Sequence, residues 1–263
     1  MRYGILGVAI ATAFAVSAGP SYAQADAKAI IEKAITAHGG KDLLEKYPAS
    51  RNKFKGDLSI MGQDIAFEGT SVQAPGQFKL TMVADVFGQK LNVVQIVDGS
   101  KVKVKQSLGG MDLPNTAGEA EMEELKFSVV GQEIATFVPL LSKPKKYTLK
   151  AEADEDVDGK KASVVTVTAK LDEKGDKTKD VKLYFDKTSN LLVKTSRKGL
   201  APGEMDGREV PQEGFLSDYK KIDGIMVAMK TVSFIDGKKF MTLTATEHVN
   251  LEKVDKNEFN LDD

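Results

Sequence analysis

Few side chains in this 263-residue sequence are of the types that carry chemistry, and they are widely spaced. The sequence has no cysteine, which excludes disulfides, thiolate zinc sites, cysteine nucleophiles and iron–sulfur clusters. Its two histidines, His38 and His248, are too far apart in sequence for a compact metal or triad motif. The G-x-S-x-G, H-E-x-x-H, P-loop and G-x-G-x-x-G motifs are absent. We therefore expect no catalytic residue, metal site or cofactor, and we expect a protein that is not an enzyme.

Three weaker patterns each have a simple structural explanation. Asp154, Asp156 and Asp158-Gly159 match the first half of a calcium-binding loop, but the twelfth position is Val165, which cannot supply the required carboxylate. His38 precedes two glycines, where a cationic imidazole would stabilise a helix C-terminus. With 38 acidic residues, a carboxylate-pair hydrolase stays open as the weakest alternative, because nothing points to a particular pair.

The charge balance argues against a nucleic-acid partner. Lys and Arg total 37 against 38 Asp and Glu, which gives a formal charge of −1, and no dense basic stripe is present. A local cluster of Lys143, Lys145, Lys146 and Lys150 either protects a sheet edge from unwanted pairing or contacts anionic lipid headgroups or an acidic partner. With 41% hydrophobic and 29% charged residues, the composition is that of a soluble globular protein.

Residues 1–23 have the layout of a cleavable export signal. Arg2 gives a positive start, an apolar run extends from Ile5 to Val16, and Ser21-Tyr22-Ala23 places small residues at the cleavage site. The apolar run is shorter than the ~20 residues that a membrane-spanning helix needs. We expect cleavage after Ala23, or after Ala25, and export to the periplasm. Without a cysteine the mature chain cannot be lipidated, and no later segment is apolar enough to span a membrane.

The rest of the sequence predicts a mainly β protein. Residues 26–37 have the apolar spacing of an amphipathic helix, and from residue 51 the period changes to two, as in half-buried strands. Residues 108–116 read as a loop and 117–141 as a helix, so that 107–146 forms a helical, lid-like insertion. Strands then continue from residue 147, separated by turns of the Asp-Gly type at 158–159, 206–207, 223–224 and 236–237.

We expect about eleven antiparallel strands in a single domain that covers residues 24–263. A sheet of this size twists and curls, and a curved sheet with helices on its concave side buries both apolar surfaces. The predicted fold is therefore an incomplete antiparallel β-barrel, or strongly curved sheet, with an N-terminal helix and the helical insertion. The interior of such a half-barrel is either filled by side chains or left open for an apolar ligand.

Three segments resemble the periplasmic lipoprotein-carrier superfamily, the LolA-like or outer-membrane lipoprotein-sorting proteins. They are the strand–turn–strand at 182–193, the hairpin at 215–225 (FLSDYKKIDGI) and the helix around Ile30–Ala34, and the resemblance is strongest over 180–250. This resemblance implies an open barrel with a helical lid that shields acyl chains.

The leading hypothesis is a periplasmic binding protein that sequesters lipid or acylated, lipoprotein-like ligands in an apolar half-barrel cavity. The alternative is a periplasmic sensor or envelope protein-interaction module with a filled core, whose partner would be another envelope protein. Apolar side chains that could line the cavity, or else fill the core, are Phe78, Leu80, Met82, Leu91, Val93, Met122, Leu125, Phe127, Phe137, Phe185, Met226 and Phe234.

Overall fold

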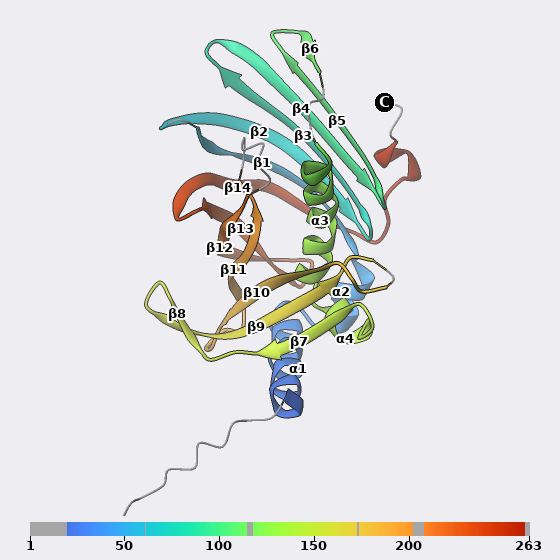
Figure 1. The fold of residues 1–263 in the computed structure, drawn as a ribbon, viewed down its shortest axis with the longest axis vertical. Coiled ribbons are helices and arrows are strands. Elements are labelled where there is room, and N and C mark those ends of the chain that lie inside the picture. The colour runs from blue at the N-terminus through green and yellow to red at the C-terminus, as the bar shows by residue number, and fades with distance from the viewer. Residues whose placement is uncertain (1–19, 61, 115–117, 173, 202–207, 261–263) are drawn as a thin grey trace, which may run out of the picture.

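The computed structural model describes residues 20–60, 62–114, 118–172, 174–201 and 208–260. Over these residues the chain forms one antiparallel sheet of fourteen strands with helices on one side (Figure 1). The strands are β1 (Ala49–Ile60), β2 (Gln63–Ala74), β3 (Gln77–Val86), β4 (Gln89–Asp98), β5 (Lys101–Leu108), β6 (Met111–Leu113), β7 (Tyr147–Ala151), β8 (Glu155–Val157), β9 (Lys160–Lys170), β10 (Thr178–Asp186), β11 (Leu192–Leu200), β12 (Glu209–Ile222), β13 (Ile225–Ile235) and β14 (Lys238–Leu251). The helices are α1 (Pro20–Ala37), α2 (Lys41–Lys46), α3 (Glu119–Ala135), α4 (Val138–Ser142) and the 3₁₀ turn η1 (Lys256–Phe259).

Along the sequence, the helical segment connects the two edge strands of the sheet. The strand order is β6-β5-β4-β3-β2-β1-β14-β13-β12-β11-β10-β9-β7, with β8 paired to β9 outside this path. The chain therefore starts at the middle of the sheet, reaches one edge at β6, and resumes at the opposite edge with β7. Helices α3 and α4 lie in the connection, and the last strand, β14, pairs with the first.

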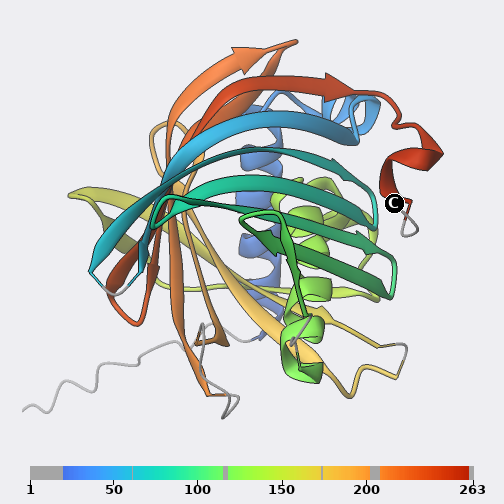
Figure 2. The same cartoon turned by 90° about the horizontal axis from the view of Figure 1, so that it is seen from above.

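Two glycines allow the strong curvature of the sheet at β1 and β2. A Cβ on Gly56 would lie 1.9 Å from the carbonyl oxygen of Thr242 and 2.8 Å from the Phe67 ring. A Cβ on Gly69 would lie 2.2 Å from the Thr81 carbonyl oxygen and 2.8 Å from the Phe54 ring. Each phenylalanine thus covers a glycine of the neighbouring strand, which lets the backbones approach as the sheet bends. Figure 2 shows the resulting arch, with α1 and α3 beneath it.

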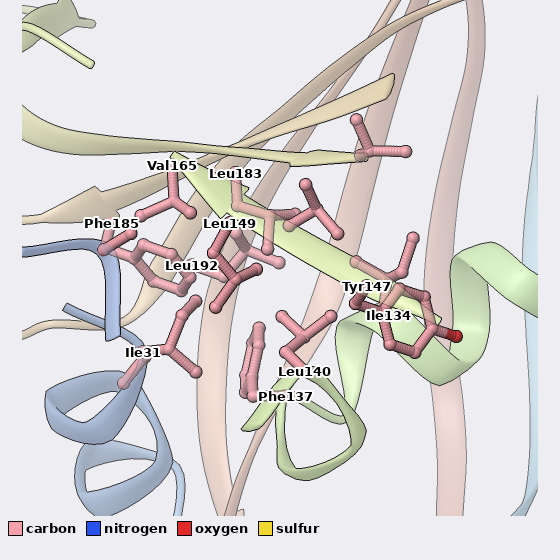
Figure 3. Close-up of a cluster of buried hydrophobic side chains, with 14 of the residues drawn as sticks. Ile31, Ile134, Phe137, Leu140, Tyr147, Leu149, Val165, Leu183, Phe185 and Leu192 are labelled. Carbon is pink, nitrogen blue, oxygen red and sulfur yellow. The ribbon is translucent and has the colours of Figure 1, made fainter. Parts of the chain in front are cut away.

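The concave side of β7 and β9–β11 is filled by a compact core. Helices α1 and α4 pack against β7, and the largest cluster of buried side chains joins them to the sheet. Figure 3 shows Ile31 of α1 and Leu140 of α4 directed towards Leu183 and Phe185 of β10. These four side chains are at most 2% exposed. This half of the protein is closed by its helices.

Smaller clusters cover parts of the convex side. Val157 at the end of β8 packs with Val164 and Tyr184, so β9 and β10 are buried on both faces. Burial and the nearby acidic side chains of Glu155 and Glu213 raise the pKa of Tyr184 to about 12. At the other end of the sheet, Phe259 of η1 packs on the convex face.

The curved, open antiparallel sheet predicted from the sequence is confirmed, and its strands number fourteen in the described residues instead of about eleven. Segment 108–116 was expected to be a loop, but residues 111–113 form β6 by hairpin pairing with β5, and β8 arises in the same way on β9. The Asp-Gly turns at 158–159, 223–224 and 236–237 all have positive φ at both residues, as type I′ turns require. The turn at 206–207 lies outside the described residues.

The helical insertion differs from the single predicted helix over 117–141. Residue 117 lies outside the described residues, and α3 ends at Ala135, where Thr136 and Phe137 separate it from α4. The expected signal segment also lies outside the described residues up to residue 19. Helix α1 begins at Pro20, and its first buried residue, Ala27, follows the expected cleavage site.

Candidate ligand-binding site

We call strands β1–β6 the open half of the sheet. Pairing of β2 with β3 and of β3 with β4 brings apolar side chains of this half onto its concave face. Gly69, under the Phe54 ring, pairs with Met82, and Phe67 pairs with Ala84. Alternation along β3 places Phe78 and Leu80 on the same face, and pairing with β4 adds Leu91 and Val93. We call Phe78, Leu80, Met82, Leu91 and Val93, together with Phe54, Phe67, Leu58, Ile65, Met241 and Leu243, the concave wall.

The concave wall is only partly covered. Phe54 and Phe67 at its base are each 5% exposed, and their rings meet edge to face at 6.0 Å between centroids. Around them Leu80, Met82 and Leu91 are partly exposed, although they belong to the same apolar cluster. A contiguous apolar surface that stays partly exposed is typical of an interaction or ligand-binding surface.

Helix α3 crosses the open side of the arch (Figure 2). It contacts β4 and β5 on one side of the opening and β11 on the other, and it carries Met122 and Leu125, both partly exposed. Phe127 is 3% exposed and belongs to the closed core, with the charged groups of Lys179 and Arg197 5.2 and 5.3 Å from its ring centroid. Of the three predicted apolar residues on α3, Met122 and Leu125 thus stay partly exposed, while Phe127 is part of the core.

Two ion-pair clusters hold α3 in place. Near its N-terminus Glu124 pairs with Lys179 at 2.7 Å and with Arg197. Near its C-terminus Glu133 pairs with both Lys143 and Lys146. Burial disfavours the Glu133 carboxylate, but hydrogen bonds from the two lysines outweigh it, so the pKa of Glu133 is lower than usual.

The lysines that the sequence singled out after the insertion are thus mostly engaged within the protein. Lys143 and Lys146 hold Glu133, and Lys150 pairs with Glu152 at 3.1 Å. Two of the three acidic residues of the calcium-like pattern are likewise paired, since Asp154 bonds Lys187 and Asp156 bonds Lys161. No group of three or more potential metal ligands occurs among the described residues.

Two adjoining cavities lie between the helices and the ends of the central strands. The larger, of about 340 Å³, is bounded by α2, the α3–α4 junction and strands β1, β2, β12, β13 and β14. The smaller, of about 220 Å³, lies between α2, the β2–β3 turn and the ends of α3 and α4. Both are lined by Leu44, Pro48, Gln73 and Thr136, so they are parts of one depression. We call the larger one the polar cavity, because nine of its lining side chains can form hydrogen bonds.

The polar cavity brings together both histidines of the chain, which the sequence analysis treated separately. His248 lies with one ring nitrogen 2.6 Å from Asn52 Oδ1 and the other 2.9 Å from Asn250 Oδ1. Asn250 in turn donates to the Ile222 carbonyl at 3.0 Å, which fixes the orientation of its amide. This network holds three polar side chains of β1 and β14 in a set arrangement.

His38 differs from the charged helix cap expected from the sequence. Its Nδ1 lies 2.8 Å from the carbonyl oxygen of Ala34, so it does serve the end of α1. The ring is only 6% exposed and packs on Phe137 at 4.7 Å and Tyr219 at 5.9 Å between centroids. Burial lowers the pKa of His38, which favours a neutral imidazole that donates from Nδ1.

The remaining predicted site residues are distributed over different surroundings. Phe137 and Phe185 belong to the closed core, where their rings are 5.5 Å apart, although Phe137 also lines the polar cavity. Met226 lines the polar cavity too. Phe234 pairs with Glu213 and contacts Phe215, on the convex face, so the sheet separates it from the concave wall.

Comparisons with known proteins give structural matches only. No family model matches the sequence, and no curated protein matches it. A DUF1329 family protein from Desulfovibrio piger aligns over 89% of this chain and 97% of its own, with 16% identity and a TM-score of 0.52. An outer membrane lipoprotein-sorting protein domain from Vibrio parahaemolyticus aligns over 91% and 98%, with 13% identity and a TM-score of 0.49. A LolA superfamily protein from Nitrosomonas europaea aligns over 90% and 98%, with 11% identity and a TM-score of 0.49.

The match to the DUF1329 family protein shows that the two proteins share a fold. At 16% identity this match concerns the fold alone. Among the described residues no helix has the length and apolar character needed to cross a membrane.

Proposed function

We propose that this protein is a non-enzymatic periplasmic binding protein that sequesters a lipid or acylated ligand on its concave wall. The ligand's acyl chain would lie between the wall and α3, against Leu80, Met82 and Leu91 from the sheet and Met122 and Leu125 from the helix. Each methylene removed from water there contributes ~0.8 kcal/mol, so a chain of ordinary length gives substantial affinity.

The observation that carries this proposal is the unequal coverage of one continuous concave face. In the closed half, helices reduce the exposure of Leu183 and Phe185 to 1%. In the open half Phe54, Phe67 and Val93 are buried, but Leu80, Met82 and Leu91 of the wall stay partly exposed under an arch that is not closed into a barrel. An apolar ligand would complete the coverage that the helices provide elsewhere.

Export is part of the proposal. Residues 1–23 supply the signal, and cleavage after Ala23 leaves Ala27, Ile31 and Ala34, the fully buried residues of α1, in the mature chain. The intact mass of protein purified from the periplasm tests this directly. A mass that corresponds to a chain starting at Gln24 or Asp26 is expected, and a mass that includes residues 1–23 would contradict it.

The ligand-binding proposal is tested by titrating the mature protein with a fluorescent fatty-acid probe. The informative variants are Phe78→Asp and Phe234→Asp, because both phenylalanines are partly exposed strand residues that lie on opposite faces of the sheet. Phe78→Asp places a charge on the wall and is expected to weaken binding at least tenfold, which corresponds to about 1.4 kcal/mol. Phe234→Asp is the matched control and should stay within twofold of the original protein.

Native mass spectrometry on protein purified without detergent complements the titration, since it detects ligand that co-purifies. Absence of probe uptake by the original protein, together with a clean ligand-free mass, would refute the carrier proposal and leave the protein-interaction alternative. An equal loss of binding in the two variants would place the ligand elsewhere.

A further inference from the structure

We propose that the polar cavity is a subsite for an uncharged, hydroxyl-rich headgroup, such as the glycerol or sugar portion of an amphiphilic ligand. The inference rests on the proposed function, because it assigns the second half of a ligand whose acyl chain occupies the concave wall. To the proposed function, the inference adds the chemical class of the ligand's headgroup and the residues that would bind this class in preference to others.

The position of the polar cavity suits the polar end of such a ligand. On β1, Asn52 lines the cavity and Phe54, two residues further on the same face, belongs to the wall. On β2, Gln73 lines the cavity and pairs with Phe78 of the wall. Side chains two apart on one face of a strand are roughly 6.6 Å apart. A single molecule can therefore reach both surfaces with its polar and apolar parts.

The lining of the polar cavity favours a neutral group. Its polar side chains are hydroxyls, amides, phenols and imidazoles, and no Lys, Arg, Asp or Glu is among its described lining residues. The charged side chains of the depression, Glu45, Glu133 and Lys143, line the adjoining smaller cavity instead, so a charged headgroup inside the polar cavity would leave water without a lining countercharge. Hydroxyl groups both donate and accept, and here they meet donors and acceptors of both kinds. His38, which donates from Nδ1 to Ala34, is left with Nε2 as an acceptor for a hydroxyl.

Ser50 contributes a buried hydroxyl group that lacks a hydrogen-bond partner. It is 4% exposed, lines the polar cavity, and its Oγ has no hydrogen-bond partner among the described residues. Gln73, the cross-strand neighbour of Ser50, stands beside it on the next strand. Buried polar groups are nearly always hydrogen-bonded, so an unpaired hydroxyl in a cavity indicates a place where another group binds. By contrast Asn52 and Asn250 each place an amide oxygen within hydrogen-bond distance of a His248 ring nitrogen, and a neutral imidazole donates to one of the two.

The backbone beside the polar cavity is strained, as is common at binding sites. Phe137 has φ 61° and ψ −40°, and the N–H of Val138 donates to the Thr136 carbonyl at 2.7 Å. This is a γ-turn with a positive central φ, a rare and unfavourable conformation for a residue other than glycine. The turn interrupts the helical segment and directs the Phe137 ring onto His38 at the cavity. Pro139, at the start of α4, ends α3 in any case, so the strain adds to a break that the sequence already requires.

The test compares two probes with the same acyl chain, 1-monolauroylglycerol and methyl laurate, in competition with the fluorescent fatty-acid probe. The original protein is expected to bind 1-monolauroylglycerol about tenfold more tightly. Ser50→Ala removes only the unpaired hydroxyl, and it should weaken 1-monolauroylglycerol about fivefold while leaving methyl laurate unchanged. Its ligand-free melting temperature should be equal to or above that of the original protein, because an unsatisfied buried group is lost.

Two further variants complete the design. Gln73→Met keeps the side-chain length without hydrogen-bonding groups, and it should act as Ser50→Ala does. Ser107→Ala is the matched control, since Ser107 is a strand serine on the convex face, bonded to Asn92 at 3.3 Å. It should not change the ratio of the two affinities.

The outcomes separate the two proposals. If neither probe binds, the proposed function fails. If both bind equally, or if Ser50→Ala weakens both alike, the wall binds chains but the headgroup subsite is refuted. Lauric acid serves as a third probe with the same chain and a carboxylate. If it binds more tightly than 1-monolauroylglycerol and its binding depends on Ser50, the headgroup is anionic and the inference is wrong.

Discussion

The two halves of the sheet are built from similar strands but reach different degrees of burial. In the closed half, β9 and β10 carry Val165, Val167 and Leu183 at 0 to 1% exposure under α1 and α4. In the open half, β3 and β4 carry Leu80 and Leu91 on the same concave face, and both stay partly exposed. The difference arises from the placement of the helices, because alternation of apolar and polar residues is present in both halves. Under the proposed function, stability and binding would belong to separate regions of one sheet.

The largest expected effect comes from making the same substitution in each half. Leu183→Ala should lower the free energy of unfolding by about 2–5 kcal/mol, since it leaves a cavity in a filled core. Leu80→Ala should cost about 1 kcal/mol or less, because its side chain is already partly in water. Urea unfolding followed by circular dichroism gives both values. Equal losses would show that the open half is packed as tightly as the closed one.

A ligand should reduce the contrast between the halves. If it binds only the folded protein, a concentration of 100 times its Kd raises the free energy of unfolding by about 2.7 kcal/mol. Hydrogen exchange should then slow in β1–β4 and α3, with little change in β9 and β10, where the core is already closed. The same concentration should leave the stability of Phe78→Asp nearly unaltered. Slower exchange confined to β9 and β10 would contradict the assignment of the wall.

The ion pairs of α3 should matter less than the core and more than an ordinary surface pair. Glu124 is partly buried and bonds both Lys179 and Arg197, so Glu124→Gln should cost about 1–2 kcal/mol and speed hydrogen exchange in α3. Glu123→Gln is a matched control on the same helix, because Glu123 forms an exposed pair with Lys126. Its effect should stay within about 0.5 kcal/mol. If the two variants behave alike, Glu124 does not hold the helix.

The smallest effect concerns pH and the boundary between the halves. Burial lowers the pKa of His38 in the folded protein, so the unfolded chain binds the proton more readily. Stability is therefore complete above the unfolded pKa of about 6.5 and decreases as pH falls below it, by at most about 1.4 kcal/mol per pH unit. His38→Gln should flatten the dependence between pH 6.5 and 5.5 in urea unfolding. An unchanged slope in this variant would assign the effect to another group.

The elements of the fold were largely predictable because their signals are local. Alternation marks β1–β5 and β9–β14, and the Asp-Gly pairs mark their turns. The break between α3 and α4 has one local signal, Pro139, but the positive φ of Phe137 was not predictable, since the core and the ion pairs of Glu133 hold it in place. The short strands β6 and β8 form only because a neighbouring strand offers hydrogen bonds.

The candidate site was predictable only in part. Five of the predicted residues, on β3 and β4, lie on one face as their alternation indicates, and their contact with a ligand stays a prediction. Phe234 was not, because both faces of β13 carry apolar side chains and the sequence does not show which one is concave. The polar cavity was missed altogether, since Ser50, Gln73 and His248 come from distant parts of the chain and meet only after β1 pairs with β2 and β14.

The pairing of β1 with β14 has a consequence for the order in which the protein folds. Each half of the sheet is a run of hairpins between strands that are neighbours in sequence, so each can form early and quickly. The joint between them closes only when the last strand has been made, across a separation of about two hundred residues, and such long-range closure is slow. Until then β1 is a free edge that can capture another chain. A chain lacking β14 would therefore keep most of its hairpins and still aggregate.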